Sequence, residues 1–126
     1  MGQGAKPVLV VEDEPDVRSV LKAMLKDAGF EVVVAKDGAS ALHELWKRGG
    51  NVRLMVTDVD MGRMNGMELA ESVRSEYPAL PILFISGLPV AASELEKAAP
   101  GTRLLTKPFG PATLVEAVQK LIGDQG

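Results

Sequence analysis

The segment 54–58 reads Leu-Met-Val-Thr-Asp, and the segment 8–13 reads Val-Leu-Val-Val-Glu-Asp. Each is a short apolar run followed by carboxylates, which is typical of a strand buried on both faces of a parallel sheet. Because parallel neighbours end at the same edge, we expect Asp58 to lie near Glu12 and Asp13. Two carboxylates about 5 Å apart repel by roughly 3 kcal/mol at an effective dielectric constant of 20. The pocket is therefore predicted to hold a divalent metal, to support phosphate chemistry, or both.

Strand-like and helix-like segments alternate along the rest of the chain. Strands are predicted over residues 8–11, 31–35, 54–57, 82–85 and 103–106. Helices are predicted after Pro15, after Asp37-Gly38, around Met67 to Val73, over about 90–99, and from Pro111 onward. Five successive βα units predict an α/β fold, a parallel sheet with helices on both faces. In such folds, ligands bind outside the carboxyl ends of the strands.

Apolar residues at helical spacing indicate which helix faces meet the sheet. The first helix is expected to turn six of them to one face: Val17, Val20, Leu21, Met24, Leu25 and Ala28. The second helix carries Ala41, Leu42, Leu45 and Trp46, and we interpret Trp46 as either a core or a helix-surface residue. His43, the only histidine, falls on the polar side of that helix and is not interpreted as a phosphodonor.

Polar side chains are predicted at the carboxyl ends of four strands. Glu12 and Asp13 follow the first strand, and Asp58 follows the third with Asp60 two residues later. Ser86 ends the fourth strand and Lys107 ends the fifth. A hard dication with oxygen ligands, most plausibly Mg²⁺, would offset much of this negative charge.

Length and composition indicate one small domain. The chain has 126 residues, of which 46% are apolar, and its net charge of −3 argues against a general nucleic-acid binder. Its uninterrupted apolar runs are too short for a membrane span, and the absence of cysteine is compatible with the cytoplasm. We expect a flexible lead over 1–7, the domain over 8–123, and a tail over 124–126.

Several short motifs together resemble the response-regulator receiver domain, the phosphoacceptor module of two-component signalling. The residues that carry the resemblance are Glu12-Asp13, Asp58 with Met61 and Gly66 in Asp-Val-Asp-Met-Gly-Arg-Met-Asn-Gly (58–66), Ser86-Gly87, and Lys107-Pro108-Phe109. The resemblance implies a flavodoxin-like (βα)5 fold with five helices and strand order 2-1-3-4-5. It also implies a cis peptide bond between Lys107 and Pro108, which proline permits at modest cost.

The resemblance implies a metal site built from four acidic residues. Asp13 and Asp58 would bind Mg²⁺ directly, Glu12 would act through water, and Asp60 would offer its backbone carbonyl. The residue two beyond the phosphoacceptor also influences phosphoryl lifetime in the family, so the Asp60 side chain is expected either to orient or to repel the hydrolytic water.

The resemblance further implies a phosphotransfer reaction at Asp58. The partner would be a histidine kinase or a phosphotransfer domain whose phosphohistidine supplies the phosphoryl group. Lys107 would neutralise the phosphoryl oxygens and the Ser86 hydroxyl would donate a hydrogen bond to one of them. The protein would catalyse only its own phosphorylation and dephosphorylation, and a weak homodimer is a further possibility known in the family.

Three positions depart from the family pattern. Leu104 stands where many receivers carry an aromatic switch residue, and leucine has no ring to swing between two sites. Gly62 replaces the usual proline, and Gly87 stands where alanine is frequent, so both loops are expected to be looser. We therefore expect phosphorylation to order the region 87–99 more than it flips one side chain.

Other interpretations of the same residues stay open. Asp13 alone also fits a helix cap, because Asp before a Pro-led helix is a common start. Leu104 leaves room for an interaction module that works without phosphorylation. Asp58-Val59-Asp60 also fits the opening motif of haloacid-dehalogenase-like phosphatases, although the acidic pair then comes too early in the chain. The chain is expected to be either a single-domain regulator or a receiver cut from a longer protein, such as a hybrid kinase.

Overall fold

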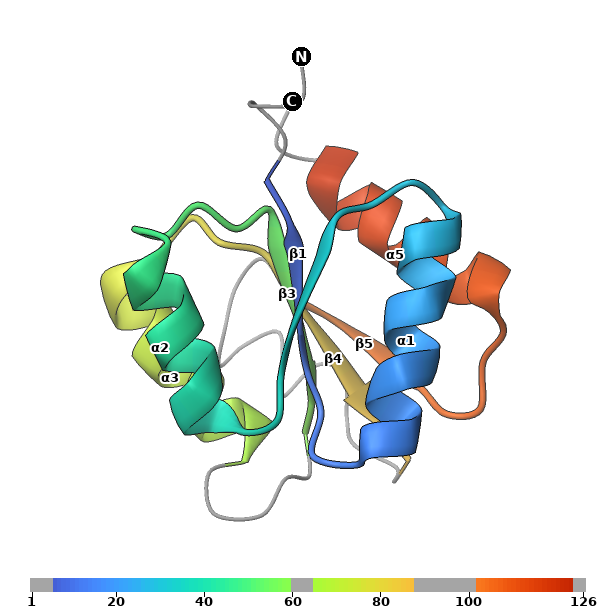
Figure 1. Cartoon of the computed structure of the whole chain (residues 1–126), viewed down its shortest axis with the longest axis horizontal. Helices are drawn as coiled ribbons and strands as arrows, with labels where there is room; N and C mark the ends of the chain where they lie inside the picture. The colour runs from blue at the N-terminus through green and yellow to red at the C-terminus, as the bar shows by residue number, and fades with distance from the viewer. Residues whose placement is uncertain (1–5, 60–64, 88–101, 124–126) are drawn as a thin grey trace.

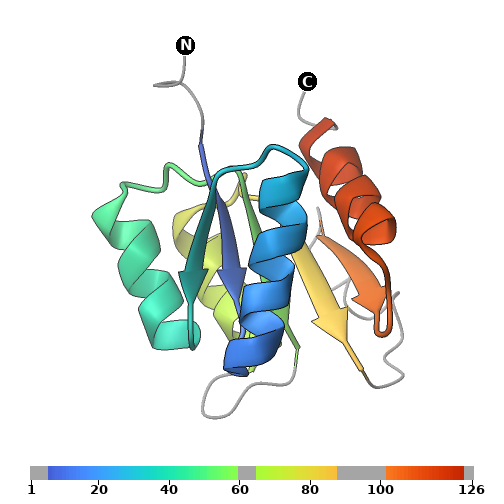
Figure 2. The ribbon, with the colours of Figure 1, turned by 45° about the vertical axis from the view of Figure 1, so that its right-hand side comes forward.

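A five-stranded parallel sheet forms the centre of the protein. A computed structural model describes residues 6–59, 65–87 and 102–123. Its strands are β1 (Val8–Val11), β2 (Val32–Ala35), β3 (Leu54–Asp58), β4 (Ile82–Ser86) and β5 (Thr102–Thr106). They lie in the order β2-β1-β3-β4-β5, every neighbouring pair is parallel, and Figure 2 shows their arrows pointing the same way. The predicted α/β fold and strand order are confirmed.

Helices cover both faces of this sheet. The described helices are α1 (Pro15–Asp27), α2 (Gly38–Lys47), α3 (Gly66–Glu76) and α5 (Pro111–Gly123). Figure 1 shows α2 and α3 together on one side of the sheet and α1 and α5 on the other. The helix predicted over about 90–99 lies outside the described residues. In the part of the chain that is described, no helix has the length and apolar character needed to cross a membrane.

Alternate residues of each central strand enter opposite cores, as the two-residue period of a strand requires. In β1, Leu9 and Val11 pack in the core beneath α2 and α3, whereas Val8 and Val10 pack in the core beneath α1 and α5. All four are fully or almost fully buried. Burial on both faces explains why the sequences of the central strands are continuous apolar runs.

The ends of the first two helices follow local signals in the sequence. Pro15 opens α1, and Gly29 follows its end with a φ of 97°, a left-handed conformation that suits glycine. The N-cap residue of α1 is Glu14, without a side-chain capping bond. The alternative in which Asp13 caps this helix is therefore wrong. Asp13 precedes the cap residue, and its carboxylate lies with those of Glu12 and Asp58.

Among the described residues, two large hydrophobic side chains are exposed to solvent. Val20 was expected on the inner face of α1 but is 51% exposed, and that expectation is wrong. It directly precedes Leu21, which faces the sheet, and one residue turns a helix by about 100°. Trp46 is 72% exposed, one position beyond the fully buried Leu45, so the helix-surface alternative is the correct one. Four strand ends differ from the predicted ones by a single residue each: β2 begins at Val32, β3 ends at Asp58, β4 ends at Ser86 and β5 begins at Thr102.

Candidate functional site

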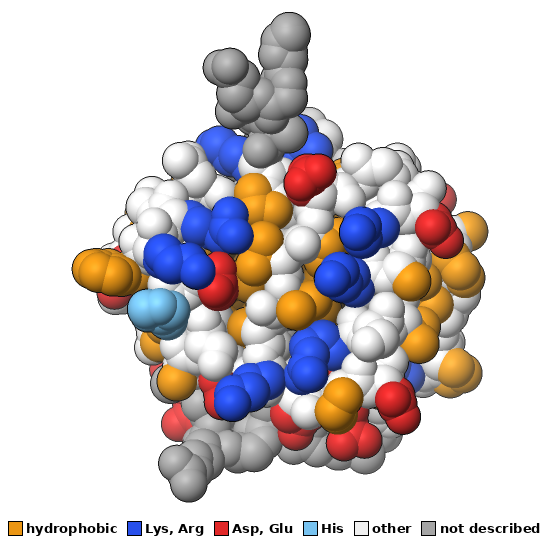
Figure 3. Space-filling model, viewed as in Figure 1, with side chains coloured by type: hydrophobic (Ala, Val, Ile, Leu, Met, Phe, Trp, Pro, Cys, Tyr) orange, Lys and Arg blue, Asp and Glu red, His pale blue; other side chains and the backbone are white. Residues whose placement is uncertain are grey.

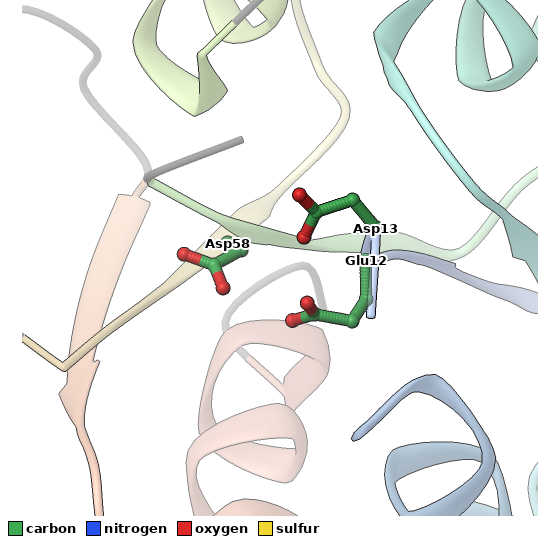
Figure 4. Close-up of side chains that lie close together, drawn as sticks. All are labelled: Glu12, Asp13 and Asp58. Atoms are coloured by element: carbon green, nitrogen blue, oxygen red, sulfur yellow. The ribbon is translucent and has the colours of Figure 1, made fainter. Parts of the chain in front are cut away.

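Three carboxylates meet at the carboxyl edge of the sheet. Val11 in β1 pairs with Thr57 in β3, so the residues that follow them, Glu12 and Asp58, emerge side by side. One carboxylate oxygen from each of Glu12, Asp13 and Asp58 lies within 4.8 Å of the others, and Figure 4 shows the side chains of Glu12 and Asp13 extending toward Asp58. Glu12 and Asp58 are buried, and Asp13 is exposed. The predicted acidic pocket is present, and its residues come from two neighbouring strand ends.

Within this pocket, Glu12 is the carboxyl group whose pKa is perturbed by its surroundings. Burial raises its pKa to about 7, and the neighbouring Asp58 and Asp13 carboxylates add to the effect. The backbone N–H of Glu14 donates to Glu12 Oε2 over 3.1 Å and opposes the rise. The other oxygen, Oε1, is buried and has no hydrogen-bond partner among the described residues. A buried carboxylate oxygen without a donor, beside two further carboxylates, fits a bound hard dication such as Mg²⁺.

Lys107 provides the positive charge of the site from the end of β5. Its Nζ donates to Asp58 Oδ2 over 3.2 Å, and its side chain is 34% exposed against 9% for Asp58. Its backbone N–H donates to the Ser86 carbonyl over 2.8 Å. The peptide bond between Lys107 and Pro108 is cis, as predicted. The lysine is thus held at both ends, by its main chain and by its ammonium group.

Ser86 is the last residue of β4 and is 2% exposed. It pairs with Thr106 across the β4–β5 ladder, directly before Lys107. On the other side of β4 lies β3, which ends at Asp58, and Asp58 pairs with Ile85. The structure therefore places Ser86 at the edge where Asp58 and Lys107 meet. Asp60, the fourth predicted metal-site residue, lies outside the described residues, as do Met61 and Gly62.

The start of α3 lies close against the backbone of the Asp58 turn. Gly66 N–H donates to the Val59 carbonyl over 2.8 Å. A Cβ at Gly66 would collide with the carbonyl oxygen of Asp58 and come within 2.9 Å of Val59 Cα. Asn65 and Glu68 form a capping box that fixes the first turn of the helix. A residue without a side chain is therefore needed where α3 packs against the end of β3.

Arg18 is a neighbour of the site that the sequence analysis did not single out. Its Nη1 donates to the carbonyl oxygen of Glu12 over 2.9 Å and ties α1 to the turn that carries the acidic pair. An arginine on a half-buried helix flank has no distinctive sequence signal, since such residues are usually solvated.

Leu104 stands where many receivers carry an aromatic switch residue. It is half-buried and packs against the core beneath α2 and α3.

The chain matches the family model of the response regulator receiver domain over residues 8–119. It therefore belongs to this family, a signalling module of two-component response regulators rather than a classical enzyme. That membership also leaves the phosphatase interpretation without support.

Relatives and solved structures agree with this assignment. The response regulator receiver protein CpdR of Brucella abortus is 35% identical over 118 residues, which is 93% of this chain and 97% of the relative. Chemotaxis protein CheY-3 of Vibrio cholerae is 35% identical over 118 residues, covering 90% of this chain and 89% of that protein. The response regulator TrrA of Thermotoga maritima, solved in complex with Mg²⁺ and BeF, superimposes with a TM-score of 0.81. Its identity is 32%, over 92% of this chain and 98% of that one.

Proposed function

We propose that this receiver accepts a phosphoryl group on Asp58 from the phosphohistidine of a histidine kinase or phosphotransfer domain. An Asp58 carboxylate oxygen attacks phosphorus, the phosphorus–nitrogen bond breaks, and the imidazole leaves as the acyl phosphate forms. The observation that carries this proposal is the 3.2 Å contact between Lys107 Nζ and Asp58 Oδ2 beside two further carboxylates. Phosphoryl transfer demands positioning and charge compensation, which such a cluster provides.

Each side chain has a role that follows from its position. Lys107, which is hydrogen-bonded to Asp58, would shift its ammonium group to donate to the oxygens of the incoming phosphoryl group. The Ser86 hydroxyl, at the adjacent strand end, would donate a hydrogen bond to another of them. Glu12, Asp13 and Asp58 would hold Mg²⁺, with the Asp60 carbonyl as a further ligand. The ion supplies positive charge that compensates the carboxylates and the incoming phosphoryl group.

The acyl phosphate would then change how the domain contacts a partner or an output, and the proposed location is the cytoplasm. The experiment that tests the proposal is incubation with acetyl phosphate, with and without Mg²⁺, followed by intact mass measurement. We expect a Mg²⁺-dependent phosphoryl adduct in the wild type and none in Asp58→Asn. Asp27→Asn, at the exposed end of α1, is the matched control and should keep the adduct.

A folded wild-type protein that forms no adduct would overturn the proposal. That result would instead favour an interaction module that works without phosphorylation. Circular dichroism of each variant separates loss of chemistry from loss of fold.

A further inference from the structure

A groove between α2 and α3 has no part in the phosphoacceptor site. The groove has a volume of about 470 Å³. It is lined by residues from the exposed flank of α2 and from the C-terminal end of α3. Figure 1 shows the two helices side by side on one face of the sheet. None of its residues belongs to the acidic pocket at the carboxyl edge.

The α2 side of the groove is aromatic. His43 and Trp46 lie one helical turn apart, with their ring centroids separated by 6.2 Å and their planes tilted by 32°. Figure 3 shows histidine beside hydrophobic side chains at the left edge of the view, over α2. Trp46 is one of two large hydrophobic side chains that the described residues leave exposed, at 72%. An exposed tryptophan beside a groove has the character of a binding anchor, because tryptophan is enriched among the residues that dominate interface energies.

The α3 side adds a further ring and a carboxylate. Glu76, the last residue of α3, and Tyr77, its C-cap residue, line the groove together with two serines. Within the described ranges, Glu76 forms no ion pair. The two cations that follow Trp46 are already engaged, since Lys47 and Arg48 both pair with Glu44, at 3.4 and 3.2 Å. The groove therefore offers aromatic faces and a carboxylate that forms no ion pair in the described part of the chain.

Aromatic faces beside a carboxylate suit a planar cation. A guanidinium stacks on tryptophan or tyrosine through cation–π attraction and forms two parallel hydrogen bonds to a carboxylate. An ammonium makes neither contact as well, because it is compact and strongly hydrated. Leu42, half-buried at the base of the groove, supplies apolar surface for the stem of the side chain.

We propose that the α2–α3 groove is a docking site for a partner protein that inserts an arginine side chain between Trp46 and Glu76. This site is separate from the phosphoacceptor pocket and does not depend on Asp58. The occupant follows from charge complementarity: among the described residues the Glu76 carboxylate has no cationic partner, and a partner arginine would supply the positive charge.

The experiment uses Trp46 as its own reporter, because it is the only tryptophan in the chain. The probe is the acetylated, amidated dipeptide leucyl-arginine, and its control is leucyl-citrulline, which has the same shape without the charge. We expect a saturable change in Trp46 emission in the millimolar range, with the arginine probe about fivefold tighter than the citrulline one. Amide shifts should localise the binding to Leu42, His43 and Tyr77.

Two matched variants test the role of the carboxylate. Glu76→Gln should abolish the preference for arginine over citrulline while leaving the fold intact. Glu71→Gln, an exposed acid of the same helix outside the groove, should retain it. Equal binding of both probes, a preference that survives Glu76→Gln, or an emission that does not saturate would each overturn the proposal. The proposal would also be overturned if Trp46 emission and the sedimentation coefficient both changed as the protein concentration was raised. That result would show that a second copy of this chain occupies the groove.

Discussion

The ammonium of Lys107 donates a hydrogen bond to Oδ2 of Asp58 over 3.2 Å, although the two residues stand 49 positions apart in the sequence. The contact joins the ends of β3 and β5, with Ser86 of β4 between these strands in the sheet order. Among the described residues, this ion pair brings a positive charge to the acidic pocket. The Lys107 ammonium compensates part of the negative charge of the three carboxylates. Its chemical importance follows from its position rather than from its contribution to stability, since Lys107 is partly exposed.

Replacing Lys107 with methionine tests this contact. The substitution keeps an unbranched side chain, one atom shorter, and removes the charge, so phosphorylation by acetyl phosphate should slow by about tenfold or more. The reason is that a hydrogen bond to a charged group is worth about 1.5–3 kcal/mol, and each 1.4 kcal/mol corresponds to about tenfold in rate. Lys120→Met, on the exposed face of α5, is the control. Equal rates for the two variants would show that the lysine has no part in the transfer.

Gly66→Ala should destabilise the protein even though alanine is the better helix former. Helix propensity alone would favour the substitution by about 1 kcal/mol. The new Cβ, however, would collide with the Asp58 carbonyl and crowd Val59, and overpacking of this kind costs about 1–3 kcal/mol. We expect a net loss in the free energy of unfolding, measured with urea.

Gly123→Ala is the matched control for this substitution. It stands at the end of α5, where an added Cβ meets no atom of the described residues within 4 Å. Its free energy of unfolding should be unchanged or slightly higher. If Gly66→Ala were equally well tolerated, the close approach of α3 to the end of β3 would not be a constraint.

Glu12 predicts a specific dependence of stability on pH in Mg²⁺-free buffer. Its pKa is about 7 in the folded protein against an ordinary 4.5, so the folded state holds the proton more tightly than the unfolded state. Stability contributed by the protonated carboxyl is present below pH 4.5 and is lost as the pH rises through 7. The loss is at most about 3–4 kcal/mol, because each pKa unit corresponds to about 1.4 kcal/mol.

Glu12→Gln removes this titration and should therefore stabilise the metal-free protein most above pH 7. Urea unfolding at a series of pH values, with a chelator present, measures the effect. Glu116→Gln, on the exposed face of α5, should leave the pH profile of the wild type unchanged. A Glu12→Gln profile that runs parallel to the wild-type profile would show that Glu12 ionises normally.

Arg18 should act as a positioning residue for the acidic pair. Its 2.9 Å hydrogen bond to the Glu12 carbonyl fixes the turn after β1. Arg18→Gln should therefore weaken Mg²⁺ binding several-fold, measured by titration calorimetry, while Arg18→Lys should restore part of it. Lys22→Gln, one turn further along α1, should bind Mg²⁺ like the wild type. Unchanged Mg²⁺ affinity in Arg18→Gln would mean that the turn holds its shape without this bond.

The amino-acid sequence alone was enough to predict the order of the elements and the edge where the site forms. Residues 8–11 and 54–57 are apolar on both faces, a pattern that a buried parallel strand produces and a surface helix does not. The carboxylates that follow them then had to meet, because neighbouring parallel strands end together. Strand ends were predicted to within one residue, since glycine, proline and charged residues mark them locally.

Tertiary packing alone decided the contacts that join distant segments. The sequence does not show that Arg18 donates to the Glu12 carbonyl, because a helix arginine can reach many acceptors. Nor does it show which apolar residues stay in solvent. Trp46 and Val20 satisfy the spacing of a buried face and yet lie beyond its edge, because the sheet covers only part of each helix. The groove beside Trp46 exists because α2 and α3 pack next to each other, a relationship set by the sheet beneath them.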